Sequence, residues 1–421
     1  MTQAIETSSN ISRDGADRSK LDLAGARAAG FSPADTLYER GTRVVQLGVN
    51  NARRSRIDHE KKPTVADYCG EFTQLIAGEN RADRVVPVRE LKMLEDGWLE
   101  RGGNKLPIAE PAFLGLLSRM GIRGGRYLAD LEPVRRAYNF NTDVAEWVKR
   151  ETEQGGEPGN VTLRLRKKAG NGPEIYAAVG GRYAPFDCDK IAAALRIAAP
   201  RDARGTVAYD GRQARFEVMF HSDVQPERYV CGEFFKAGVL VRTDDTGGGS
   251  IKLSAVVWQN LCLNLIILDK STQEIASLRH VGSVDALADK FRAGFDQALR
   301  SIDHFRKAWG YALGDDVVAD ARNEHREAYD LSVDQVMAGV FSGVVDDHRM
   351  PLPRSQGKRA EIVGDLMSMW KRDESAAAGP TRAAVVNAVT RYAHEVNQDP
   401  WREDALQSAA GSLLFGRGSA K

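Results

Sequence analysis

The stretch that decides the fold runs from Lys236 to Asp269 and reads KAGVLVRTDDTGGGSIKLSAVVWQNLCLNLIILD. Two runs rich in aliphatic residues flank the glycines at 247–249, and apolar runs on both sides of a glycine-rich turn are typical of a β-hairpin. The apolar segment that follows Trp258 predicts a further buried element. We therefore expect an antiparallel hairpin where a β-rich part of the chain meets a helical part.

The segment before this hairpin has the pattern of more strands. VTLRLRKK, which begins at Val161, alternates apolar and polar residues, and EIYAAVGG, GTVAYD and GRQARFEVMF continue the strand pattern. Asp210-Gly211 stands between two of these runs and is a strong hairpin signal. One helix interrupts the strands, from Asp187 to about Ala199.

After His280 the pattern becomes helical. Ser283 is a plausible N-cap for a long helix with apolar residues at three- and four-residue steps, and four more helices are predicted at 332–341, 358–370, 381–396 and 401–414. The predicted fold class is therefore α+β, with an antiparallel β-rich central core, flanking helices and a helical C-terminal part.

The first 152 residues are more mixed. We predict a flexible tail over 1–30, a strand at 44–49, a helix at 64–78 with Thr64 as N-cap, a strand near 85–88, a helix at 111–120 and a second short helix after a glycine turn. The predicted domains are 31–152 (mixed α/β), 153–280 (β-rich, basic) and 281–421 (helical). The basic group Arg123, Arg126, Arg135 and Arg136 is interpreted as solvated helix ends.

Composition places the chain among ordinary globular proteins. Of 421 residues, 42% are hydrophobic and 28% charged, and the formal net charge of +1 indicates neither a nucleic-acid nor a membrane partner. The four cysteines form no C-x-x-C pair, which argues against a structural zinc site. Without a signal-peptide or membrane-span pattern, we expect a cytoplasmic protein.

Local charge is more informative than net charge. Between Asn160 and Phe220 eleven Lys and Arg stand against six Asp and Glu, whereas between Val281 and Met350 eight stand against thirteen. On one strand face, Arg164, Arg166 and Lys168 would recur at about 6.6 Å, close to the nucleotide spacing of an extended backbone. We predict that these three and Arg212 contact phosphates, with the aromatic side chains of Tyr176, Tyr183 and Trp258 offering stacking surfaces.

Catalytic signatures are missing from the sequence. It contains no H-E-x-x-H, no G-x-S-x-G and no phosphate-binding G-x-x-x-x-G-K-[ST]. His325 and the Asp346 to His348 cluster are the best metal candidates, but we interpret them as exposed groups because a third ligand cannot be placed. No cofactor and no metal are predicted.

Five blocks in the same order resemble a known family. They are AEPAFLGLLSRMGIRGGRYLADL, GGRYAPFDCDKIAAAL, TDDTGGGSIKLSAVVWQNLCLNLI, GPTRAAVVNAVTRYAHEV and SLLFGRGSAK, within residues 105–421. The chain resembles the phage- and plasmid-borne domain-of-unknown-function family numbered nine hundred and thirty-two, from which it departs at Leu116, Arg123 and 186–188. The resemblance implies a mobile genetic element and a layout like that of single-strand annealing recombinases.

Three functions follow as hypotheses. The first is a phage- or plasmid-type protein that binds single-stranded nucleic acid and assists annealing as a homo-oligomer. The second is a non-enzymatic interaction protein that targets a host protein through its acidic helices. The third is a metal-dependent nuclease built on Asp244, Asp245 or the Asp346 to His348 cluster.

Overall fold

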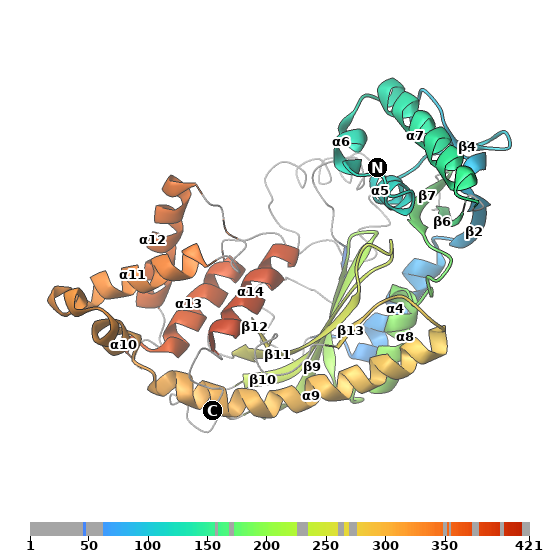
Figure 1. Ribbon diagram of the computed structural model, residues 1–421. Helices are drawn as coiled ribbons and strands as arrows, with labels where there is room; N and C mark the ends of the chain where they lie inside the picture. The colour runs from blue at the N-terminus through green and yellow to red at the C-terminus, as the bar shows by residue number, and fades with distance from the viewer. Residues whose placement is uncertain are drawn as a thin grey trace, which may run out of the picture.

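The computed structural model describes residues 45–47, 62–155, 159–167, 172–224, 235–259, 265–268, 276–347, 352, 355–372, 379–395 and 400–414. The predicted tail and most of the segment up to residue 61 lie outside this part of the chain. The described residues form a large sheet with helices around it and a smaller α+β unit at one end (Figure 1).

The large sheet is antiparallel and has the predicted hairpin at its centre. Its strand order is β1-β8-β9-β10-β11-β12, with β13 paired to β11. The hairpin joins β10 to β11 through the glycine turn, and Asp210-Gly211 joins β8 to β9. The strands are β1 (Val45–Leu47), β8 (Arg204–Tyr209), β9 (Gln213–Val224), β10 (Phe235–Asp244), β11 (Ile251–Gln259), β12 (Leu265–Leu268) and β13 (Ala276–Leu278).

Helices α4 (Val65–Ala77) and α9 (Val284–Gly314) pack against this sheet, and the long α9 runs beside the strands (Figure 1). Helix α8 (Cys188–Ala198) contacts both α4 and α9. The predicted caps are confirmed: the Thr64 side chain accepts a hydrogen bond from the Asp67 amide, and that of Ser283 accepts one from the Ala286 amide. Local capping signals therefore place the helix starts correctly.

The C-terminal helices complete the core of the large sheet. Their apolar side chains belong to the same buried cluster as the strands, so this helical part is not packed separately. Asp404, which is fully buried, pairs with Arg215 of β9 at 2.7 Å and fixes the last helix on the sheet. These helices are α10 (Val317–Glu324), a 3₁₀ turn η4 (Arg326–Asp330), α11 (Val333–Asp346), α12 (Gln356–Arg372), α13 (Arg382–Glu395) and α14 (Pro400–Leu414).

The smaller unit has its own core and two small sheets. One sheet has the order β2-β6-β7 and the other β3-β4-β5. The strands are β2 (Ala82–Pro87), β3 (Lys92–Met93), β4 (Leu99–Arg101), β5 (Asn104–Leu106), β6 (Asn160–Lys167) and β7 (Pro173–Val179). The helices are η3 (Val88–Glu90), α5 (Glu110–Arg119), α6 (Gly125–Asp130) and α7 (Pro133–Glu153).

Two features of this region bear on the predictions. The short helix predicted after the glycine turn is confirmed as α6, which has six residues. The next helix, α7, was not predicted as a separate element; it has 21 residues and buries Phe140 and Trp147 against the small core. The boundary predicted at 152/153 does not separate the two cores, because β6, which follows the boundary, pairs with β2, which precedes it, opposite Val85 and Val86. Pairing between strands distant in sequence is not encoded in local patterns.

Helix α5 lies very close to β7. A Cβ atom placed on Gly115 would stand 2.6 Å from the carbonyl oxygen of Ala178, which no side chain tolerates. Glycine therefore permits this helix to approach the strand and positions its C-terminal end beside the large sheet. Of the helices in the described part of the chain, none is long and apolar enough to cross a membrane.

Candidate functional site

The two strand arginines predicted to contact phosphates are buried. Arg164 is 2% exposed and Arg166 is 1% exposed. Both project from β6 toward the large sheet, so the small sheet uses this face for packing. The predicted exposed basic face is therefore not formed by these two residues, and a phosphate cannot reach them in this conformation.

Arg164 is surrounded by acceptors: Asp187 directly before α8, the backbone at Asp245, and Asp83 of the neighbouring strand β2. Its Nη1 donates to Oδ1 of Asp187 at 2.9 Å and to the carbonyl oxygen of Asp245 at 2.8 Å, and its Nη2 pairs with the second Asp187 oxygen. Its Nε donates to Oδ1 of Asp83 at 3.1 Å. A buried guanidinium that satisfies its donors in this way serves to join elements.

Arg166 and Arg81 extend the same network. Nε of Arg166 donates to Oε1 of Glu174 at 2.6 Å, and its Nη1 donates to the carbonyl oxygen of Gly211 in the β8–β9 turn. Nη1 of Arg81 donates to Oδ2 of Asp245 at 2.7 Å. We use the name joint for the buried charges that connect the small and large sheets, together with two neighbouring tyrosines. Its members are Arg81, Arg164, Arg166, Glu174, Asp187, Asp245, Tyr176 and Tyr183.

The predicted stacking residues also lie inside the molecule. The ring of Tyr176 has the Cζ atoms of Arg81, Arg164 and Arg166 at 5.2 to 5.4 Å from its centroid, a cation–π arrangement within the joint. Tyr183 is half-buried and stacks on the ring of His280 at 5.1 Å. None of these rings is free to accept a base.

Trp258 is on the other side of the large sheet. It is 3% exposed and packs with Met219 and Leu240 in a small apolar cluster. Lys168 lies outside the described residues. Among the predicted residues that the structure describes, only Arg212 has substantial exposure, with 37% of its side chain accessible, and it pairs with Asp244 at 2.8 Å.

Burial changes the protonation chemistry of the joint. Burial, together with the negative charge of Asp187, raises the pKa of Asp245 to about 6. Asp187 has a lowered pKa because the hydrogen bond and charge of Arg164 outweigh the effect of burial. Burial, followed by the charge of Asp245, raises the pKa of the Cys188 thiol well above its ordinary value. Cys188 is therefore a neutral thiol that donates to Asp245 at 2.7 Å, and it is unsuited to act as a nucleophile.

A polar cleft opens beside the joint, where α5 and α6 face the turns of the large sheet. It has a volume of about 460 Å³ and is lined by Ser118 and Arg119 of α5, Arg126 of α6, Arg212, and the turn at 246–248. Three guanidinium groups from separate parts of the sequence thus converge on one cavity. Glu110 and Asp210 also line it, so the lining carries both signs of charge.

Two of the three guanidinium groups are available to bind an anion. Arg119 and Arg126 are both exposed, and neither forms an ion pair or a side-chain hydrogen bond with any residue that the structure describes. The guanidinium of Arg119 lies against Gly180, where a Cβ atom would stand 3.1 Å from its Nη1. By contrast, Arg212 is already neutralised by Asp244. Within the described part of the chain, the cleft therefore offers two unpaired cations to an anion.

Exposed tyrosines accompany these arginines on the surface. Tyr127, next to Arg126, is 70% exposed, and Tyr138 on α7 is 73% exposed. Arg135 lies three residues before Tyr138 on α7 and therefore shares its side of the helix. Between Ser118 and Tyr138 there are five arginines against two carboxylates. The sequence showed this basic group, but not that it borders a cleft completed by residues almost a hundred positions later.

The metal candidates gain no support from the geometry. Within the described ranges, no group of three or more His, Cys, Asp or Glu side chains is arranged to hold a metal ion. Asp346 pairs with Arg359 at 2.8 Å, and His348 lies outside those ranges. Asp244 forms an ion pair with Arg212, and Asp245 forms one with Arg81. The nuclease hypothesis therefore has no assembled site among these residues.

Comparison with known proteins adds no relatives. No protein-family model, no curated protein and no solved structure matches this chain. The resemblance over residues 105–421 thus stays a prediction.

Proposed function

We propose that this chain binds single-stranded nucleic acid along the cleft between α5, α6 and the glycine turn. The observation that carries the proposal is the pair of exposed, unpaired guanidinium groups of Arg119 and Arg126 facing a cavity of about 460 Å³. Arginine binds phosphate oxygens with a planar fork of donors, which suits a nucleic-acid backbone. Because the arginines would hold the strand by its phosphates, its bases would stay accessible for pairing, and the protein could then assist strand annealing.

The surface around the cleft supports the same partner. Tyr127 and Tyr138 present aromatic faces within the same arginine-rich segment. Non-specific single-strand binding combines a positive groove with aromatic platforms, because every base has a face that can stack. An origin in a phage or plasmid, action in the cytoplasm and a homo-oligomeric form belong to the same proposal and rest on the sequence.

The test is a salt titration with a labelled oligothymidylate, read by fluorescence anisotropy. The double variant Arg119→Gln with Arg126→Gln removes two phosphate contacts, so the slope of log K against log salt should become shallower by about 1.4, at roughly 0.7 per contact on single strands. The matched control is Arg150→Gln, which removes an exposed arginine from the last turn of α7, and it should leave the slope unchanged.

Two results would contradict the proposal. The first is a wild-type protein that does not bind the oligonucleotide at low salt. The second is a double variant that stays folded, by circular dichroism, and binds with the wild-type slope. Retention of binding in the double variant together with its loss in Arg150→Gln would place the interface elsewhere on the small unit.

A second candidate is protein binding by the helical part. Several large apolar side chains there are exposed within a short span of sequence: Tyr311, Tyr329, Leu331 and Val333 are 65, 60, 40 and 41% exposed. Asp330 and Asp334 lie beside the last three in the sequence. If this surface targets a host protein, a pull-down should recover one stoichiometric protein without nucleic acid, and Tyr329→Asp should abolish its recovery.

A further inference from the structure

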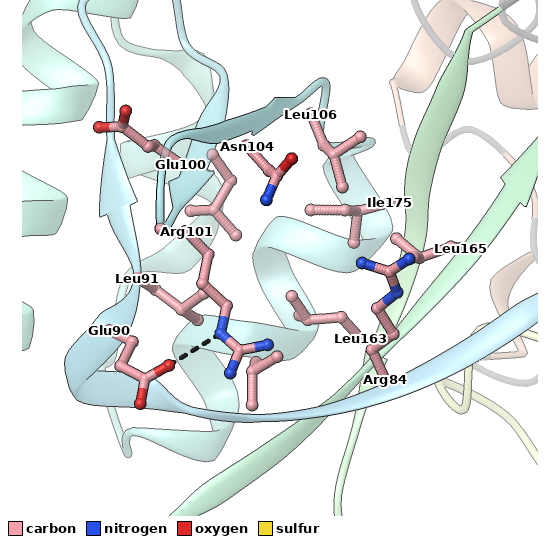
Figure 2. A pocket seen from close by; sticks show the side chains of 13 residues that line it. Arg84, Glu90, Leu91, Glu100, Arg101, Asn104, Leu106, Leu163, Leu165 and Ile175 are labelled. Carbon is pink, nitrogen blue, oxygen red and sulfur yellow. Dashed lines mark hydrogen bonds and ion pairs between the residues drawn. The ribbon is translucent and has the colours of Figure 1, made fainter.

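A second cavity lies within the small unit, away from the joint. It has a volume of about 450 Å³ and opens between the β2-β6-β7 sheet and the β4–β5 hairpin (Figure 2). Cavities of this size are typical of small-molecule sites. This one shares no lining residue with the cleft between α5, α6 and the glycine turn.

One wall of the cavity is apolar because of the alternation along β6. Arg164 and Arg166 project toward the joint, so Leu163 and Leu165 between and beside them project to the opposite face and line the cavity. Ile175 of β7 lies beside them, and Leu91, Leu99 and Leu106 contribute from the other elements around it. These six aliphatic side chains would take an apolar body out of water, at about 25 cal/mol per Å² of buried surface.

One positive charge at this cavity has no partner among the residues that the structure describes. Nε of Arg101 donates to Oε2 of Glu90 at 2.8 Å, so that pair is neutral as a whole. The guanidinium of Arg84 lies beside Leu165 and Ile175, while the carboxylate of Glu100 points away (Figure 2). Arg84 makes no ion pair or side-chain hydrogen bond with any residue in the described ranges. Its strand pairing with Leu163 explains why it faces the cavity.

We propose that this cavity binds a small monoanion with an apolar body, of the medium-chain or arylalkyl carboxylate class. The carboxylate would accept hydrogen bonds from the Arg84 guanidinium, and the hydrocarbon would lie on Leu163, Leu165 and Ile175. A nucleobase fits less well, because its polar edge would be placed against aliphatic side chains without hydrogen-bond partners. The site is therefore distinct from the nucleic-acid cleft and does not depend on it.

The experiment measures binding by isothermal titration calorimetry on the full chain. Decanoate is the charged probe, used below its micelle-forming concentration, and decanol is its neutral counterpart. We expect saturable decanoate binding at least tenfold tighter than decanol binding, since a charge-assisted hydrogen bond contributes about a tenfold factor or more. Arg84→Gln should remove that difference, whereas Arg89→Gln, an exposed neighbour that does not line the cavity, should keep it.

A second variant and a competitor complete the design. Leu106→Trp, at a half-buried lining position, should weaken both probes by occupying the cavity while the unfolding transition stays cooperative. The oligothymidylate should not displace decanoate. Absence of saturable decanoate binding, equal binding by Arg84→Gln, or displacement by the oligonucleotide would each overturn the proposal, and the last would assign the cavity to the nucleic-acid interface.

Discussion

Arg164 and Asp187 face each other across the joint, with Nη1 of the arginine 2.9 Å from Oδ1 of the aspartate and both side chains less than a tenth exposed. The arginine belongs to the small sheet, and the aspartate stands directly before α8 of the large unit. Their contact shows that the basic strand of the sequence is used for holding two sheets together. A buried ion pair of this kind becomes costly when one partner is removed.

We predict that Arg164→Gln lowers the free energy of unfolding by about 3 to 5 kcal/mol, the usual cost of leaving a buried charge without its partner. Asp187 would keep its burial but lose two charge-assisted hydrogen bonds. Urea unfolding followed by circular dichroism measures the change. The control is Lys167→Gln, an exposed residue on the same strand, which should alter stability by no more than about 0.5 kcal/mol. Equal stabilities for the two variants would show that the pair does not hold the joint.

The sequence predicted most elements because their signals are local. The cap at Thr64, the Asp210-Gly211 turn and the glycine hairpin each specify the backbone within a few residues, and the structure has all three. The small β3-β4-β5 sheet went unpredicted, since its strands have only two or three residues and show little alternation. The α+β class follows from the local signals alone.

The candidate site could not be predicted to the same extent. Alternation on β6 shows which residues share a face but not what covers that face, and the covering groups, Asp187 and Asp245, come from turns far along the chain. Arg119 and Arg126 were visible as basic residues, yet their cleft needs Arg212 and the glycine turn to close it. Long-range packing decides which arginines reach solvent.

Replacing an exposed tyrosine should weaken base stacking without changing the number of phosphate contacts. Tyr127 is 70% exposed. We predict that Tyr127→Ala makes the free energy of binding to oligothymidylate less favourable by about 1 to 3 kcal/mol, the usual contribution of one stacked base. The salt slope should stay at the wild-type value because no phosphate contact is lost. Tyr311→Ala is the control, since this tyrosine is 65% exposed on the remote helix α9. A changed slope with unchanged affinity at low salt would contradict the assignment.

In the glycine turn, alanine should destabilise the protein at Gly247 but not at Gly248. Gly247 has a φ of +75°, and a Cβ atom there would stand 2.6 Å from Cγ1 of Val179 in the small sheet. We predict that Gly247→Ala costs about 1 to 3 kcal/mol of stability through backbone strain and displacement of the joint. Gly248→Ala meets only ordinary contacts of 3.5 Å or more and should change stability little. Thermal unfolding of the two variants tests this, and equal melting temperatures would refute it.

Asp245 should give the joint a measurable pH dependence. Burial and the charge of Asp187 raise its pKa from 3.8 to about 6, so between these values the folded protein binds a proton that the unfolded chain has released. The contribution of Asp245 to stability is therefore fully present below about pH 4 and is lost as pH rises through 6. Asp187 acts in the opposite sense but at lower pH, because its pKa is lowered.

The variant Asp245→Asn isolates this effect. It cannot titrate, whereas other shifted groups, such as Asp210 and His280, are present in both proteins and cancel in the difference. The stability of wild type minus that of Asp245→Asn should fall between pH 4 and pH 7, by an amount on the order of 2 to 3 kcal/mol at about 1.4 kcal/mol for each unit of pKa shift. Urea unfolding of both proteins at several pH values measures the difference. A difference that stays constant or rises across this range would mean that the carboxyl of Asp245 is ionised throughout, held by Arg81 at 2.7 Å despite its burial.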